Sequence, residues 1–100
     1  MYVVIFRAKV KKFDDEYSRT AARMRELALT EFGCIEFCAV TEGQDEMALS
    51  YWPSEESIKA WKSHPEHLDA QRLGRERWYD SYSVQIAEVS REYSVGNKGY

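Results

Sequence analysis

The first stretch of the chain, residues 2–10, has the composition of a strand that is apolar on both faces. Its sequence, YVVIFRAKV, is rich in β-branched and aromatic residues, which favour extended backbone. Because side chains alternate along a strand, Val4 and Phe6 share one face while Ile5 belongs to the other. The pattern therefore predicts a strand that is covered on both sides.

The next part of the chain predicts one helix and then a β-hairpin. Apolar residues recur at helical spacing over residues 14–32, and either Asp14 or Asp15 can cap the start of this helix. Residues 34–42 and residues 46–52 have the composition of strands and are separated by a short turn. Two strands this close in sequence pair most simply as an antiparallel hairpin.

A proline divides the second helical segment into two parts. Ser54 can cap a helix, and Pro65 then forces a break because proline is tolerated only in the first turn of a helix. We therefore expect a fresh helix to begin near Pro65. Gly74 lies inside it at a cost of about 1 kcal/mol relative to alanine, which indicates close approach by backbone, a bulky neighbour or a ligand. Of these we favour crowding by Trp78 or Trp61.

The last strand is predicted over residues 82–93, with a bulge near Ala87 because Val89 shifts the parity of the apolar positions. The order of elements is then β-α-β-β-α-β, the ferredoxin-like α+β plan with both helices on one face of an antiparallel sheet. We expect residues 1–93 to form one such domain and residues 94–100 to form a flexible tail. Since helices cover only one face, the other needs a lid, and a second copy in a homodimer is the simplest one.

Charge and hydropathy argue against two classes of partner. The formal charge of -3 does not suit a nucleic-acid-binding protein, which needs a net basic face. The longest apolar runs are far shorter than the roughly 20 residues that cross a bilayer, and the start of the chain lacks the features of a signal peptide. We therefore expect a cytoplasmic protein with neither nucleic-acid nor membrane partners.

The two cysteines, Cys34 and Cys38, fall on one face of a predicted strand. Their spacing places them about 13 Å apart, which is beyond the reach of a disulfide. We expect two reduced core thiols.

Residues 54–82 hold both histidines and two of the three tryptophans, so chemistry is expected there. Within them, the runs AWKSHPEH (residues 60–67) and GRERWYDSY (residues 74–82) resemble the antibiotic biosynthesis monooxygenase domain, and in particular its small stand-alone bacterial members. The resemblance covers residues 1–93. It implies a dimeric α+β barrel in which two ferredoxin-like subunits pack their sheets together, and each subunit keeps a pocket between its helices and its sheet. It also implies a cofactor-independent oxygenase, which works without metal or flavin on a small or polycyclic phenol or quinol that itself activates oxygen.

Functional residues of the family are carried over one position at a time. The tryptophan that members place in the second helix corresponds to Trp61. The heme-degrading branch also uses an asparagine on the first strand, where this chain has Phe6 and Arg7, and a later histidine, where it has Gln71. The resemblance therefore argues against heme degradation by that mechanism.

His67 is the predicted catalytic residue, a general base whose ordinary pKa near 6.5 suits neutral pH; the alternative is a histidine that only hydrogen-bonds a neighbour. Trp61 and Trp78 are predicted as walls of the site, although aromatic stripes are usually core packing. Arg75 is predicted to pair with an anionic substrate group, or else with a surface carboxylate. His64 also has a simpler interpretation as a helix cap. The predicted substrate-binding residues are Trp61, His64, Gln71, Arg75 and Trp78.

Other function classes make distinguishable predictions. A zinc site on His64 and His67 is disfavoured because Pro65 spoils the helical spacing of the two rings. A non-catalytic dimer that binds a ligand or heme, or is purely structural, is the main alternative, and a fully packed interior would favour it. A pocket of a few hundred Å³ lined by Trp61 and a histidine would favour an enzyme. An RNA-recognition module would need exposed aromatics beside basic residues on an open sheet.

Overall fold

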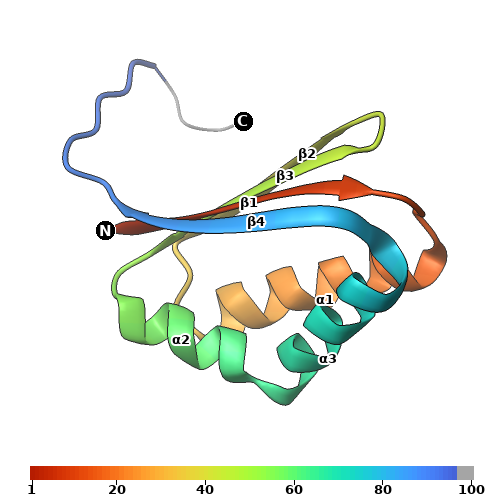
Figure 1. Ribbon diagram of the computed structural model, residues 1–100. Coiled ribbons are helices and arrows are strands. Elements are labelled where there is room, and N and C mark those ends of the chain that lie inside the picture. The colour runs from red at the N-terminus through yellow and green to blue at the C-terminus, as the bar shows by residue number, and fades with distance from the viewer. Residues whose placement is uncertain (97–100) are drawn as a thin grey trace.

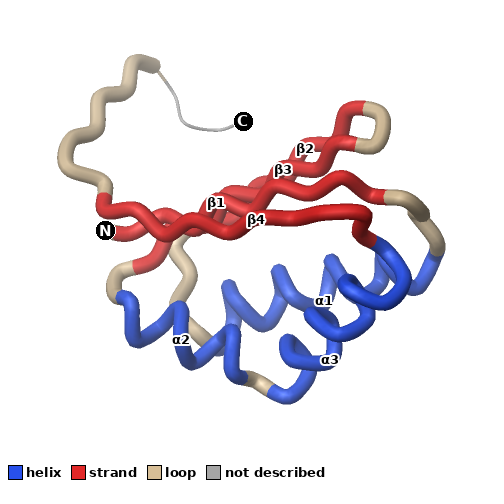
Figure 2. The backbone as a smooth tube through the Cα atoms, in the orientation of Figure 1, coloured by secondary structure: helices blue, strands red, loops and turns tan. Residues whose placement is uncertain are grey.

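The computed structural model describes residues 1–96 and contains one four-stranded antiparallel sheet with its helices on a single face (Figure 1 and Figure 2). The strands are β1 (Tyr2–Val10), β2 (Glu36–Glu42), β3 (Asp45–Trp52) and β4 (Tyr79–Glu88), in the spatial order β2-β3-β1-β4. The helices are α1 (Asp15–Glu31), α2 (Glu55–Ser63) and α3 (Pro65–Leu73), followed by a π-helical turn, η1 (Gly74–Trp78). This arrangement confirms the ferredoxin-like α+β fold.

The helix α1 begins and ends close to the predicted positions. Asp14 is its cap, since Oδ1 accepts a hydrogen bond from the Tyr17 N–H at 2.8 Å. Beyond the end of the helix, Gly33 has a φ of 77°, a left-handed conformation that glycine adopts without steric cost. Leu27 and Ala28 are completely buried and fix α1 against the sheet.

The break at Pro65 is confirmed. The Oγ atom of Ser54 accepts a hydrogen bond from the Ser57 N–H at 3.2 Å and caps α2. His64 is extended (φ -61°, ψ 138°), and its Nδ1 accepts from the Glu66 N–H at 3.1 Å, so this ring caps α3. Pro65 occupies the first turn of α3, where its missing N–H leaves no helical hydrogen bond unmade.

Gly74 is crowded by a different residue from those predicted. It begins η1, and a Cβ atom at this position would lie 2.6 Å from Cε2 of Tyr79. The prediction that Trp78 or Trp61 crowds it was wrong. The glycine allows the ring of Tyr79 to lie directly against the backbone of the π-helical turn.

The strand β4 is displaced from its predicted span of residues 82–93 and starts at Tyr79. The shift in its pairing with β1 lies between Lys9 and Val10, while Ala87 pairs regularly with Val3, so the bulge predicted near Ala87 is absent from the described strand. Residues 89–96 form neither helix nor strand, and the end of the predicted tail, residues 97–100, lies outside the described residues.

The two cysteines lie in different environments because β2 begins at Glu36 and not at residue 34. Cys34 is buried, and its Sγ donates to the carbonyl oxygen of Glu36 at 3.2 Å. Cys38 lies opposite Leu49 on the face of the sheet away from the helices, and it is exposed. Both are free thiols, but the prediction of two core thiols was wrong for Cys38.

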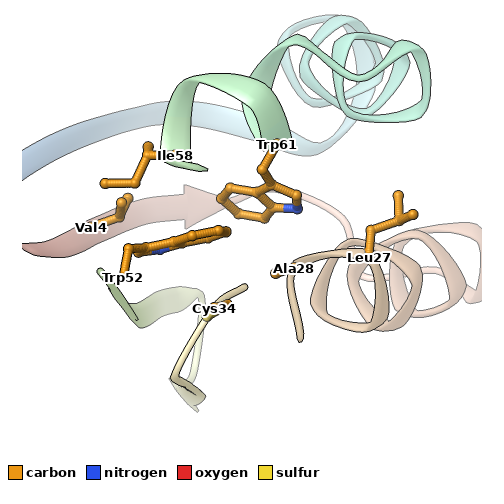
Figure 3. Packing of buried hydrophobic residues seen from close by; sticks show 7 residues of the cluster. All are labelled: Val4, Leu27, Ala28, Cys34, Trp52, Ile58 and Trp61. Carbon is orange, nitrogen blue, oxygen red and sulfur yellow. The ribbon is translucent and has the colours of Figure 1, made fainter. Parts of the chain in front are cut away.

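Two clusters of buried residues hold the helices on the sheet. The first, shown in Figure 3, packs Trp61 of α2 against Trp52 of β3 with ring centroids 5.1 Å apart. Its buried members are Val4, Leu27, Ala28, Cys34, Trp52, Ile58 and Trp61. The second consists of Ala8, Val10, Tyr17 and Trp78. Since Val4 belongs to one cluster and Ala8 to the other, the middle of β1 lies between them.

The other face of the sheet carries no helix within the described chain (Figure 1). The centre of this face carries apolar side chains from β1, β2 and β3, and some are well exposed, including Val40 at 67% and Met47 at 39%. The set comprises Val3, Ile5, Val40, Met47, Leu49 and Tyr51. Polar residues surround them, among them Arg7 of β1 and Gln85 of β4. None of the helices formed by residues 1–96 combines the length and the apolar character required to cross a membrane.

Candidate active site

A cavity of about 490 Å³ lies between the sheet and the helices. Its floor comes from all four strands, and its other walls come from α1, α2 and α3. The volume falls within the roughly 300–1,000 Å³ of sites that bind small organic molecules. Trp61 and His67 both line it, which is the feature expected of an enzyme rather than of a packed structural domain.

Small side chains on facing elements leave this space empty. The cavity is bordered by Ala21 and Ala22 of α1, Ala70 of α3, Ala39 of β2 and Ala48 of β3. Larger residues at these positions would extend into the space between helix and sheet. Alanines on the sheet-facing side of a helix are a sequence signal for such a space.

Trp61, His67 and Gln71 form one end of the cavity. The indole of Trp61 is only 6% exposed, and its Nε1 donates to the Met24 carbonyl at 3.1 Å, which fixes the ring. The imidazole of His67 packs against it with ring centroids 4.4 Å apart and an interplanar angle of 83°. Trp61 is thus both a core residue and a wall of the cavity.

Gln71 determines which nitrogen of His67 carries the proton. Its Nε2 lies 3.1 Å from the Lys62 carbonyl oxygen and 2.9 Å from His67 Nδ1. Because a carbonyl can only accept, the group that faces Lys62 must be the amide NH₂. The second hydrogen of this NH₂ is donated to Nδ1, so a neutral imidazole carries its proton on Nε2. No residue within 1–96 hydrogen-bonds that Nε2, which leaves it available to a ligand.

Burial keeps this imidazole neutral. It lowers the pKa of His67 from 6.5 to about 4, and the charges of Lys62 and His64 act in the same direction. A ring with this pKa is a weak proton acceptor at neutral pH. The geometry therefore favours a hydrogen-bond donor at His67 over the general base suggested by the sequence.

Glu46 of β3 lies at the other end of the cavity and receives two hydroxyl groups on one oxygen. Thr41 Oγ1 donates to Oε2 at 2.8 Å, and the Tyr17 hydroxyl donates to the same atom at 3.4 Å. Burial raises the pKa of Tyr17, and neighbouring Tyr79 and Glu46 raise it further. Burial also raises the pKa of Tyr79. Both tyrosines are therefore neutral phenols at physiological pH.

Three predicted substrate-binding residues do not border the cavity among the described residues. His64 caps α3 and packs against Phe32, with centroids 5.8 Å apart. Arg75 is exposed on η1, and Trp78 is buried in the second cluster, edge-on to Tyr17 at 5.3 Å. Gln71 does border the cavity, beside His67.

Glu46 and Tyr79 were not predicted as site residues. They come from β3 and β4, and no short sequence motif links these elements. Tyr17 and Tyr51 could each line a pocket by their sequence, and only Tyr17 borders this cavity among the described residues. In residues 1–96, histidine, cysteine and acidic side chains do not gather in groups of three or more that could hold a metal ion.

Comparison with known proteins places the chain in a family. The family model for antibiotic biosynthesis monooxygenase matches residues 1–73, which is most of the chain. The uncharacterized protein YqjZ of Bacillus subtilis (strain 168) is 38% identical over 92 residues, which make up 91% of this chain and 81% of that protein.

Solved structures support the same fold. SnoaB, a cofactor-independent oxygenase from Streptomyces nogalater, has a TM-score of 0.75 at 12% identity, with 91% of this chain and 94% of that chain covered. Rv0793 from Mycobacterium tuberculosis has a TM-score of 0.78 at 17% identity, with 93% and 98% covered. A putative antibiotic biosynthesis monooxygenase from Nitrosomonas europaea has a TM-score of 0.76 at 16% identity, with 91% and 100% covered.

At these low identities the solved structures show only that the fold is shared. The family model and YqjZ show the family relationship. The matched residues 1–73 run from β1 to the end of α3 and include Trp61, His67 and Gln71. The resemblance suggested by the sequence is thereby confirmed. The chain belongs to the antibiotic biosynthesis monooxygenase family.

Proposed function

We propose that the protein is a cofactor-independent monooxygenase that acts, as a homodimer, on a small or polycyclic aromatic of the phenol or quinol type. The family supports monooxygenase chemistry, and SnoaB, which shares the fold, is a cofactor-independent oxygenase. The observation that carries the proposal is the cavity of about 490 Å³, which brings the Trp61 ring and the polar edge of His67 to one wall.

In such a reaction the bound substrate supplies the electrons. A phenol that has released its O–H proton to water is electron-rich and passes one electron to O₂, and the resulting radical pair combines into a peroxide anion on a ring carbon. This anion takes a proton back, and the O–O bond then breaks as the ring carbon loses its hydrogen, which gives a quinone and water. One phenol and one O₂ account for all atoms of the products. The protein has to bind the aromatic, assist proton movement and keep bulk water away.

The residues of the cavity fit these tasks. Trp61 provides an apolar wall for an aromatic ring, and the backbone carbonyl of Met24 fixes its orientation. His67 offers a neutral Nε2–H that can donate to an oxygen of the substrate or of the peroxide. Ala21 and Ala22 of α1 provide the room for a flat ring system between helix and sheet.

The support for a homodimer comes from the face of the sheet that carries no helix within residues 1–96. Ile5 and Leu49 lie opposite each other near its centre, and exposed Val40 and Met47 extend the apolar area. A large exposed apolar area usually marks an interaction surface, and two-fold dimers are the commonest assemblies. The non-catalytic alternative is less well supported. A fully packed interior would favour it, whereas the interior contains a cavity.

Oxygen uptake and thermal shift with a panel of phenols and hydroquinones of increasing ring number test the proposal. We expect at least one compound to raise the melting temperature, because ligands that bind only the folded state stabilise it. The same compound should support oxygen consumption and quinone formation. A folded dimer that neither binds nor oxidises any compound of the panel would overturn the proposal.

The substitution Ala48→Leu provides a matched test of where the compound binds. Ala48 lies on the cavity floor between Phe6 of β1 and Ala39 of β2, so a leucine there occupies the cavity. We expect the variant to fold, with a melting temperature at or near that of wild type, and to lose both the thermal shift and the oxygen uptake. Retention of both signals would place binding elsewhere.

A further inference from the structure

The charged side chains that line the cavity have opposite signs at its two ends. Among the described lining residues they are Arg25, Lys62 and Glu46, while His67 is neutral. Arg25 lies over the ring of Phe37, with its Cζ atom 5.5 Å from the centroid, and Phe37 packs edge-on against Trp61 at 6.1 Å. Arg25 and Lys62 thus lie at the same end of the cavity as Trp61 and His67. Glu46 lies at the other end.

The register of the sheet gives the separation of the two ends. Phe37 pairs with Ser50 of β3, while Thr41 pairs with Glu46 of the same strand. Four residues of extended strand span about 13 Å. This is long enough for a fused aromatic ring system to lie along the cavity floor with a polar group at each end.

Glu46 has acceptor capacity that the protein does not use. Both of its hydrogen bonds, from Thr41 and from Tyr17, go to Oε2, and no residue within 1–96 donates to Oε1. The nearby hydroxyls of Tyr17 and Tyr79 are neutral, so the carboxylate is the charged group at this end of the cavity. A carboxylate repels anions and accepts hydrogen bonds from hydroxyl groups.

We propose that Glu46 is a ligand-binding residue whose Oε1 accepts a hydrogen bond from a hydroxyl group on the aromatic ligand. The opposite end of the ligand then carries a carbonyl or carboxylate oxygen that meets the Nε2–H of His67 and the positive charge of Arg25 and Lys62. The cavity thereby selects an aromatic with a hydroxyl donor at one end and an oxygen acceptor at the other, and it fixes the orientation of the bound ligand. This inference rests on the proposed function, because it specifies the ligand of the same cavity.

Isothermal calorimetry with three probes tests the inference: a naphthoate with a hydroxyl on the opposite ring, the methyl ether of that compound, and unsubstituted naphthoate. Hydrogen bonds to a charged acceptor are strong enough for about tenfold or more in affinity. We expect the wild-type protein to bind the hydroxynaphthoate at least about tenfold more tightly than the other two probes. This ranking is measured on wild-type protein and does not depend on any variant that folds poorly.

The substitution Glu46→Gln then locates the acceptor. It retains the side-chain volume and removes the charge, and we expect the preference for the hydroxyl to shrink to about twofold. Glu42→Gln is the matched control, because Glu42 lies on the same hairpin but does not line this cavity. It should keep the full preference.

An unchanged preference in the Glu46→Gln variant would overturn the assignment. So would the absence of a preference, or of hydroxynaphthoate binding, in the wild-type protein. The binding measurement is independent of turnover, so failure of the oxygenase proposal shows itself separately, as a lack of oxygen uptake by a protein that still ranks the three probes.

Discussion

Single residues and their immediate neighbours set the polarity of the cavity. Gln71 donates to Nδ1 of His67 because the same amide group must also donate to the Lys62 carbonyl. Thr41 and Tyr17 donate to one oxygen of Glu46 and leave the other available. A neutral donor near Arg25 and Lys62 and a carboxylate acceptor thus stand at opposite ends of a cavity that is otherwise lined mainly by apolar side chains. This arrangement orients a ligand with two different ends.

The lowered pKa of His67 predicts an acid-sensitive contribution to stability. The ring has a pKa of 6.5 when unfolded and about 4 when folded, so between these values the unfolded chain binds more protons than the folded protein. Stability therefore rises with pH across this window, and the contribution is complete above pH 6.5 and lost as pH falls toward 4. Its full size is roughly 3 kcal/mol. Urea unfolding between pH 4 and pH 7.5 should show a steeper acid loss for wild type than for a His67→Gln variant.

His64 provides the control for this measurement. It caps α3 through Nδ1, and asparagine is also a good capping residue, so His64→Asn should preserve the cap. This variant should retain most of the acid dependence of the wild-type protein, because burial and not the charge of His64 is the main cause of the lowered pKa of His67. If wild type and His67→Gln instead differ by the same free energy at every pH, His67 does not titrate as its buried position requires.

At the scale of elements, the π-helical turn η1 positions one wall of the cavity. The turn leads directly into β4, whose first residue, Tyr79, lies against Gly74. The ring of Tyr79 contacts Phe6 with centroids 5.5 Å apart and Tyr17 with centroids 6.1 Å apart. The close approach at Gly74 therefore places a neutral phenol beside Glu46 and the cavity floor.

This contact predicts that Gly74→Ala destabilises the protein, although alanine is the better helix former. The added methyl would lie 2.6 Å from the Tyr79 ring, which has other aromatic rings around it. Overpacking of this kind costs about 1–3 kcal/mol. Thermal and urea unfolding measure the loss, which should be smaller in a Tyr79→Leu background because the obstructing ring is gone. An equal loss in both backgrounds would place the strain elsewhere in η1.

Signals carried by a few neighbouring residues were sufficient to predict much of the fold. The caps at Asp14 and Ser54 and the break at Pro65 follow from local chemistry, and the structure contains all three. The start of β4 was misplaced because Tyr79 joins the sheet only through its pairing with Val10, which lies far away in sequence. The polar end of the cavity at Glu46 depends on strand register in the same way, and no local pattern indicates it.

The site residues likewise include some that a local sequence pattern can indicate and some that only the packing of distant elements brings together. His67 and Gln71 stand one helical turn apart on α3, so a sequence motif can contain both. Tyr17 and Glu46 are brought together from α1 and β3 only by the packing of the helix on the sheet. Residues 61–71, which are close together in the sequence, could therefore be predicted as one group, whereas contacts between distant parts of the chain could not.

At the scale of the whole molecule, the two faces of the sheet differ, since the helices of residues 1–96 cover one face and leave the other bare (Figure 1). We expect the bare surface to form the homodimer, and Leu49, opposite Ile5 and Cys38 near its centre, to be essential to it. Leu49→Arg should place a charge in this surface without touching the cavity, and analytical ultracentrifugation at tens of micromolar should show a folded monomer where wild type is a dimer. Leu68→Arg makes the same change on the exposed side of α3, where Leu68 is 52% exposed, and should remain dimeric. A wild-type protein that sediments as a monomer would contradict the proposed assembly, because the apolar face would then stand in water with no partner to offset the unfavourable hydration.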